Sequence, residues 1–142
     1  MLEIRKIMDD REMYSVEPEQ SVSEVARIMS ALNVGAILVV QDGRLEGVFS
    51  ERDLMTRVVV AGRNPETTQV GLVMSTNLAT IAESASSEEA MSLMHRHGCR
   101  HLPVMRLHTV AGMVSMRDLM KVELAEKTEE LEQMRAYIQS AL

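Results

Sequence analysis

The sequence aligns with itself at a shift of 65 residues, and this internal duplication restricts the possible folds more than any other feature. The alignment runs without a gap from Ser15 to Arg57. The apolar spacing of residues 4–8 also returns in residues 70–74, at a shift of 66. Two copies of about 60 residues are each too small to bury a comfortable core alone. We therefore expect the copies to pack face to face around a pseudo-two-fold axis.

Each copy shows the pattern β-α-β-β-α, which places the chain in the α/β (α+β) class. A Ser followed three residues later by a Glu is typical of a helix start, and this capping box occurs at Ser21 and at Ser86. The apolar run Ala36–Val40 predicts a strand buried on both faces, and Asp42-Gly43 predicts the hairpin turn that follows it. The patterns also predict short strands near residues 14–16 and 79–81, a return strand over 45–49 and a second helix from Ser50 to about Gly62.

Three segments follow from this organisation: a first repeat over residues 1–65, a second repeat over 66–121 and a C-terminal amphipathic helix over 122–142. The end of the chain has apolar residues at alternating steps of four and three, the spacing by which helices pair, with a charged interruption at Lys127. These positions are Met120, Leu124, Lys127, Leu131, Met134, Ile138 and Ala141. About three heptads are short for an autonomous coiled coil. The helix therefore packs on the protein itself or on a second copy, and we favour the second copy.

The composition argues against several classes of partner. The chain has 142 residues with 15 Lys+Arg and 21 Asp+Glu, and its formal charge of −6 opposes binding to a phosphate backbone. With only Tyr14, Phe49 and Tyr137 as aromatic residues, it has no stacking platform for bases. No apolar run approaches the ~20 residues that span a bilayer. Because Cys99 is the single cysteine and no targeting segment is recognised, we expect a cytoplasmic protein. Together these features lead us to expect that it binds neither membrane nor nucleic acid.

A second duplicated motif brings a hydroxyl, a guanidinium and a carboxylate to the point where a buried strand leads into a helix. The motif comprises Ser50, Arg52 and Asp53 in the first copy and Ser115, Arg117 and Asp118 in the second. A Ser with an acid three residues later is also an ordinary helix start. Two features point beyond capping. Asp is shorter than the Glu or Gln that capping boxes prefer, and the helix dipole disfavours an Arg in the first turn, yet both copies have one.

The three residue types together suit a nucleotide. A carboxylate has two acceptor oxygens, which can hold the two hydroxyls of a ribose. The free N–H groups of a helix N-terminus attract an anion, and an Arg can add a bidentate contact to phosphate. The motif therefore indicates a site that binds a sugar next to a phosphate.

The duplicated unit resembles a tandem pair of CBS domains, also called a Bateman module, over residues 1 to about 121. Both copies have a Ser-x-x-Asp element after Gly47 or Gly112, and lead-ins that end in Ile7-Met8 or Val73-Met74. The second copy has the strand entry Leu102-Pro103-Val104. The segments 50–53 and 62–65 are similar to those of small stand-alone prokaryotic pairs. This resemblance implies a non-catalytic regulatory module that binds an adenosine-containing small molecule, forms a homodimer and signals to a regulated protein that the sequence does not identify.

The resemblance also implies two clefts between the copies. In one cleft Ser115, Arg117 and Asp118 would face Ser15, Ala36 and Ile37. In the other, Ser50, Arg52 and Asp53 would face Thr80, His101 and Leu102. In both, the Asp would take the ribose, the Arg the phosphate, and the backbone at Ile37 or Leu102 the adenine edge. Leu38 stands where the second copy has Pro103, so the two clefts need not bind equally.

Other chemistries have weaker support. The four histidines and Cys99 all lie in the second copy, but their spacing does not match a zinc site, and we expect no metal. Neither Ser50 nor Ser115 has a plausible general base as a partner, so we expect that the protein is not an enzyme. The ligand stays open among AMP, ADP, ATP, a dinucleotide and S-adenosylmethionine, with no further cofactor. The competing hypothesis is a ligand-free oligomerisation module that acts through its C-terminal helix.

Overall fold

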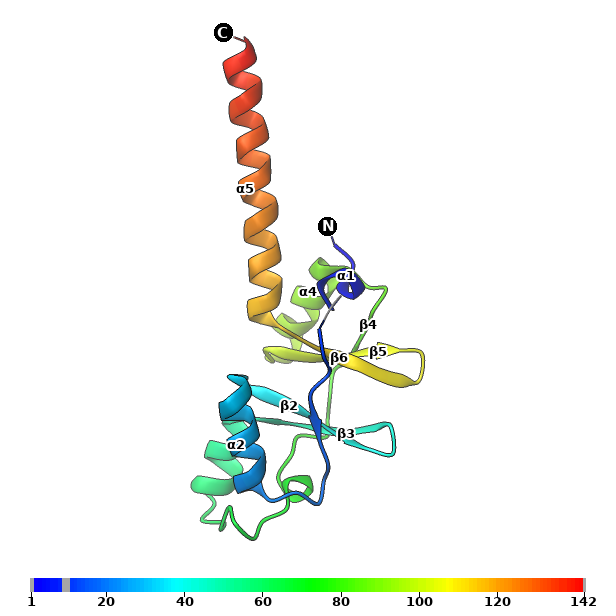
Figure 1. Cartoon of the computed structure of the whole chain (residues 1–142), viewed down its shortest axis with the longest axis vertical. Coiled ribbons are helices and arrows are strands. Elements are labelled where there is room, and N and C mark those ends of the chain that lie inside the picture. Colours follow the sequence, from blue (N-terminus) through cyan, green and yellow to red (C-terminus); the bar gives the residue numbers. More distant parts are fainter. Residues whose placement is uncertain (1, 9–10, 142) are drawn as a thin grey trace.

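The computed structural model describes residues 2–8 and 11–141 and contains two three-stranded sheets. The first sheet has the order β1 (Ser15–Val16), β2 (Ala36–Gln41), β3 (Arg44–Ser50), and the second has β4 (Ile81–Ala82), β5 (His101–Arg106), β6 (Thr109–Ser115). In each sheet the first two strands are parallel and the last two form an antiparallel hairpin. The two sheets lie one above the other in Figure 1. The predicted duplicated α/β architecture is therefore confirmed.

The long helices begin where the capping signals predicted. Helix α2 (Val22–Leu32) follows Ser21, whose hydroxyl accepts from the Glu24 N–H, and α4 (Ser87–His97) follows Ser86 in the same way. Both helices end at a residue in the left-handed conformation, which satisfies their last carbonyls. The shorter helical segments are α1 (Ile4–Met8), α3 (Glu51–Asp53), the π-helical turn η1 (Leu54–Val59) and the 3₁₀ turn η2 (Val70–Leu72). Gly62, where the second helix was expected to end, has a positive φ of 72°.

The two copies exchange the segments that precede them. Ile4, from α1, is fully buried in the core of the second copy, and its N–H donates to the Ala85 carbonyl at 2.8 Å. Val70, from η2, is fully buried in the core of the first copy, and its N–H donates to the Gln20 carbonyl at 2.9 Å. Each small core is thus completed by a segment that the sequence places ahead of the other copy. Neither copy is a self-sufficient unit, as expected for cores of this size.

Strand β2 joins the first core to the interface between the copies. Ile37 and Val39 face the core of the first copy, whereas Ala36 and Leu38 belong to a third apolar cluster. That cluster includes Met113 from β6, and β6 contacts both β2 and β3. The prediction that β2 is buried on both faces is confirmed. The functional consequence is that the start of β2 lies at the interface between the copies.

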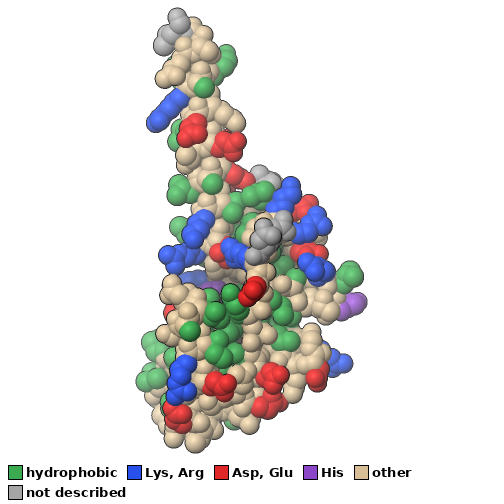
Figure 2. Space-filling model, in the orientation of Figure 1, with side chains coloured by type: hydrophobic (Ala, Val, Ile, Leu, Met, Phe, Trp, Pro, Cys, Tyr) green, Lys and Arg blue, Asp and Glu red, His purple; other side chains and the backbone are tan. Residues whose placement is uncertain are grey.

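The second helix of the second copy and the C-terminal segment form one uninterrupted helix, α5 (Met116–Ala141). The helix has 26 residues, and it rises away from the two sheets in Figure 1. Hydrophobic side chains line its free part in Figure 2, between acidic and basic ones. Thus the chain has no helix boundary between residues 121 and 122, where the sequence analysis placed a segment boundary. None of the helices within 2–8 and 11–141 is long and apolar enough to cross a membrane.

Candidate functional site

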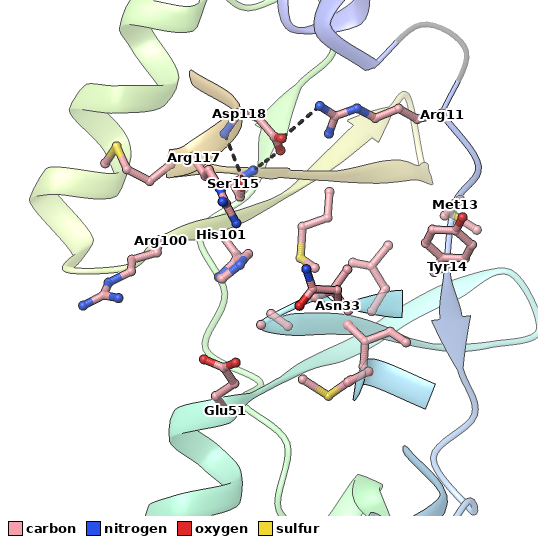
Figure 3. Close-up of a pocket in the computed structure, with 18 of the residues that line it drawn as sticks. Arg11, Met13, Tyr14, Asn33, Glu51, Arg100, His101, Ser115, Arg117 and Asp118 are labelled. Carbon is pink, nitrogen blue, oxygen red and sulfur yellow. Dashed lines mark hydrogen bonds and ion pairs between the residues drawn. The ribbon is translucent and has the colours of Figure 1, made fainter. Parts of the chain in front are cut away.

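A cleft of about 1080 Å³ opens between the two copies, and the duplicated Ser-Arg-Asp motif of the second copy lies in its wall. One side of the cleft comes from the start of β2 and the end of α2, and the other from the end of β6 and the first turn of α5. Figure 3 shows Asp118, Ser115, Arg117 and His101 directed toward the same space. The predicted site residues that line this cleft are Ala36, Ile37, His101, Ser115, Arg117 and Asp118.

Local structure fixes where Asp118 lies. Strand β6 ends at Ser115, and the Met116 N–H donates to the Arg100 carbonyl at 2.8 Å, so the start of α5 is tied to the start of β5. The Ser115 hydroxyl accepts from the Asp118 N–H at 3.1 Å, and the Asp118 carboxylate accepts from the Ser115 N–H at 2.8 Å. These two bonds form a capping box with an Asp in place of the usual Glu. They hold the carboxylate at the mouth of the helix, facing the cleft.

Arg11 contacts the same carboxylate from the chain that leads into β1. Its guanidinium donates to Asp118 Oδ1 at 2.9 Å, and the side chains of Arg11 and Asp118 are 40% and 18% exposed. Burial would raise the pKa of Asp118, but the hydrogen bonds from Arg11 and Ser115 outweigh it and lower the pKa below its usual value. Asp118 is therefore an ionised acceptor at the wall of the cleft.

Asp53, the counterpart of Asp118, has a different environment. It is only 6% exposed, and its Oδ2 accepts from the Ser50 N–H and the Ser50 hydroxyl, each at 3.0 Å. Its Oδ1 accepts from the Ser75 hydroxyl at 2.9 Å, with the Arg57 guanidinium 3.5 Å away. Ser75 is held over Asp53 by paired backbone bonds to Val48 at 3.0 and 2.8 Å. Asp53 is thus turned into the fold as a helix cap.

The structure places two of the residues that were grouped with Asp53 in the expected second cleft, His101 and Leu102. His101, which was grouped with Asp53, lines the Asp118 cleft because it pairs with Ser115 across β5 and β6. His101 thus lies beside the Ser-Arg-Asp motif of its own copy, and the cleft expected around Asp53 stays a prediction. Leu102 is fully buried in the core of the second copy. The other predicted residues that are absent from the lining of the Asp118 cleft are Ser15, Ser50, Arg52, Asp53, Thr80 and Pro103.

Basic side chains gather at one end of the cleft. Figure 3 shows Arg100, His101 and Arg117 grouped there, across from Glu51. Burial lowers the pKa of His101, which favours the neutral imidazole, although Asp118 and Glu51 act against that shift. The positive charge at this end therefore comes from Arg100 and Arg117, which suit it to an anion.

Several residues of the cleft were not found by sequence reasoning. Arg11, Tyr14, Asn33 and Glu51 line it, and none of them belongs to the Ser-Arg-Asp motif. Tyr14 directly precedes Ser15, which was predicted, so the strand was located correctly but one residue was missed. Arg11 had no detectable signal, because its contact with Asp118 joins residues 107 positions apart.

The His and Cys residues of the second copy do not form a metal centre in the described part of the chain. No group of three or more His, Cys, Asp or Glu residues there is placed to hold a metal ion. Burial raises the pKa of the Cys99 thiol, which favours the protonated form. Among the described residues, the Asp118 cleft is therefore the candidate site for binding a small molecule.

Comparison with known proteins agrees with the fold. The family model of the CBS domain matches the chain twice, over residues 4–60 and 70–125. The CBS domain-containing protein YhcV of Bacillus subtilis is 39% identical over 105 residues, which are 74% of each chain. The mitochondrial CBS domain-containing protein CBSX3 of Arabidopsis thaliana is 35% identical over 126 residues. That match covers 85% of this chain but 61% of CBSX3, so the chain spans less than two thirds of that relative.

Solved structures extend the comparison. The CBS domain protein NE2398 has a TM-score of 0.82 and 28% identity, covering 87% of this chain and 98% of its own. The CBS domain pair of MJ0100 was solved with 5′-methylthioadenosine and S-adenosyl-L-methionine. It covers 89% of this chain and 98% of its own, with a TM-score of 0.78, and at 18% identity it supports the fold alone.

Proposed function

The chain belongs to the CBS-domain family, and we propose that it is a non-catalytic regulatory module that binds a phosphorylated adenosine ligand in the Asp118 cleft. The observation that carries this proposal is the ionised Asp118 carboxylate, held at the mouth of α5 in the wall of a cleft of about 1080 Å³. This volume is close to that of ordinary small-molecule pockets.

Each part of the ligand has a matching part of the cleft. In the proposed complex Asp118 accepts hydrogen bonds from the two ribose hydroxyls, since each carboxylate oxygen has a second lone pair. The adenine lies against the apolar wall of Ala36, Leu38 and Met113, which belong to the cluster between the copies. The phosphate lies at the basic end, near Arg117 and His101, where the N-terminus of α5 also favours negative charge.

The basic end favours a phosphorylated ligand over S-adenosylmethionine. S-adenosylmethionine carries a sulfonium cation, which Arg100 and Arg117 would repel. The MJ0100 pair accepts such a ligand, but its likeness to this chain concerns the fold alone. We also propose that a single cleft binds ligand, because Asp53 is almost completely buried and its carboxylate already accepts three hydrogen bonds from Ser50 and Ser75.

Signalling would follow from the position of the cleft between the copies. The ligand would contact Asp118 of the second copy and Ile37 of the first, so it would favour the relative orientation of the copies that it fits best. A regulated protein would respond to that shift. The existence of such a protein and the cytoplasmic location of this chain stay predictions.

A panel of ligands tests the proposal by thermal denaturation. We expect AMP, ADP or ATP to raise the melting temperature, because a ligand at 100 times its Kd adds about 2.7 kcal/mol, on the order of 10 °C for a chain of this size. S-adenosylmethionine should shift it less, and GMP serves as the base control. If no adenosine compound raises the melting temperature, the ligand-free oligomerisation module is the better reading.

The basic end of the cleft is tested by Arg117→Ala. We expect roughly fivefold weaker binding of ATP, because an exposed charge contact to phosphate is lost, and no change for adenosine. Arg52→Ala removes the counterpart in the first copy, which does not line the cleft, and should leave both affinities unchanged. Isothermal titration at low and moderate salt measures both ligands. An equal loss for ATP and adenosine would place the phosphate elsewhere.

A further inference from the structure

An apolar stripe on α5 stays uncovered in the described chain. The stripe consists of five residues, which we call the α5 seam: Met120, Leu124, Leu131, Met134 and Ile138. Each of these side chains is more than half exposed, from 55% for Leu131 to 69% for Leu124. They share one face of the helix, since they follow the heptad spacing. Such a continuous exposed apolar face marks an interaction surface.

The protein's own body does not cover the seam. Leu119 is the buried residue of α5, and every described residue from 127 onward is exposed. A helical segment of this length is marginal in water unless its apolar face packs on something. The sequence allowed the helix to pack either on the same chain or on a second copy. Because residues 127–141 are exposed, they do not pack on the same chain.

We propose that the α5 seam pairs with the seam of a second copy of this chain, in a parallel two-stranded coiled coil. Leu124, Leu131 and Ile138 take one set of core positions, and Met120 and Met134 take the other. Ile138 in the first set is β-branched, the residue type that favours a two-stranded coil at this position. This proposal is independent of the nucleotide site, since it uses none of the residues that line the cleft.

The charges beside the seam select the parallel orientation. Glu123 and Glu130 flank it on one side, and Lys121 and Arg135 flank it on the other. In a parallel pair the acidic flank of one helix meets the basic flank of its partner, and Glu130 and Arg135 have the five-residue offset of such contacts. In an antiparallel pair acids would face acids and bases would face bases. Parallel pairing places both clefts at the same end of the coil.

Lys127 interrupts the seam at one core position. In a parallel pair the two Lys127 side chains approach each other, which weakens the coil but fixes its register. Association is therefore reversible, and Lys127→Leu should tighten the dimer by roughly tenfold or more.

The mass of the full chain in solution tests the pairing. Sedimentation equilibrium of the wild type should give a dimer. Leu131→Glu with Ile138→Glu should raise the dimer dissociation constant by roughly a hundredfold or more, because it places charges at the core of the pair. The control, Gln133→Glu with Ser140→Glu, adds the same charge on the opposite face and should leave the dimer intact. A monomeric wild type, or a dimer that survives the seam substitutions, overturns the proposal.

Oxidative crosslinking tests the orientation. In a Cys99→Val background, Ile138→Cys should form a disulfide-linked dimer, since equivalent core positions face each other in a parallel pair. Ser140→Cys on the outer face is the control and should crosslink far less. If Ile138→Cys crosslinks only when mixed with Met120→Cys, the pair is antiparallel and the parallel proposal is wrong.

Discussion

Asp118→Asn is expected to weaken the binding of adenine nucleotides by roughly tenfold to a hundredfold and to leave the fold intact. The substitution removes the charge that two ribose hydroxyls would share, and hydrogen bonds to a charged group contribute about 1.5–3 kcal/mol. The Asn side-chain oxygen can still accept from the Ser115 N–H, so the start of α5 keeps its cap. Isothermal titration gives the affinity, and urea denaturation gives the stability.

Asp53→Asn is the matched control in the first copy, and its effects should be the reverse. The Asp53 carboxylate accepts from the Ser50 N–H, the Ser50 hydroxyl and the Ser75 hydroxyl, and it is almost completely buried. An amide nitrogen in place of one oxygen leaves a buried donor facing other donors, which should lower the free energy of unfolding by about 1–3 kcal/mol. The affinity for nucleotide should not change. Equal losses of affinity for Asp53→Asn and Asp118→Asn would instead support two working clefts.

The contrast between the two Asp residues marks how far the sequence could predict the site. The duplicated motif placed both carboxylates at the first turn of a helix, and both are there with capping partners. Their surroundings differ because of residues that the motif does not contain. Ser75 covers one carboxylate and Arg11 contacts the other. Contacts of this kind depend on how the copies pack, which no local spacing encodes.

The fold was predictable where each element has its own local signal. The caps at Ser21 and Ser86, the buried run of β2 and the hairpin turn after it each determine a local conformation, and all are present. The exchange of the lead-in segments was not predicted. Ile4 and Val70 show only that an apolar helical turn precedes each copy. Which core such a turn enters is decided by the packing of the whole chain.

The exchanged segments give a strong expected effect on stability at Gly47 of β3. A Cβ added at Gly47 would lie 2.6 Å from the Met74 sulfur and 2.7 Å from the Ser75 carbonyl oxygen. The Ser75 backbone cannot move away easily, because it is paired with Val48. We therefore expect Gly47→Ala to lower the free energy of unfolding by about 1–3 kcal/mol, as overpacking of a tight contact does.

Gly112→Ala, at the same position of β6, is the control that separates a backbone clash from a general loss of glycine. There the added Cβ would meet only the terminal methyl of Met8, on a flexible side chain that can rotate away. Replacing a strand glycine by alanine also reduces the entropy of the unfolded chain, which adds about 0.4–1 kcal/mol of stability. We expect little net change in the urea midpoint for Gly112→Ala and a clear fall for Gly47→Ala. Adding Met74→Ala should relieve only part of that fall, because the Ser75 carbonyl stays in the way. Equal midpoints for Gly47→Ala and Gly112→Ala would show that the segment after η2 does not pack this tightly against β3.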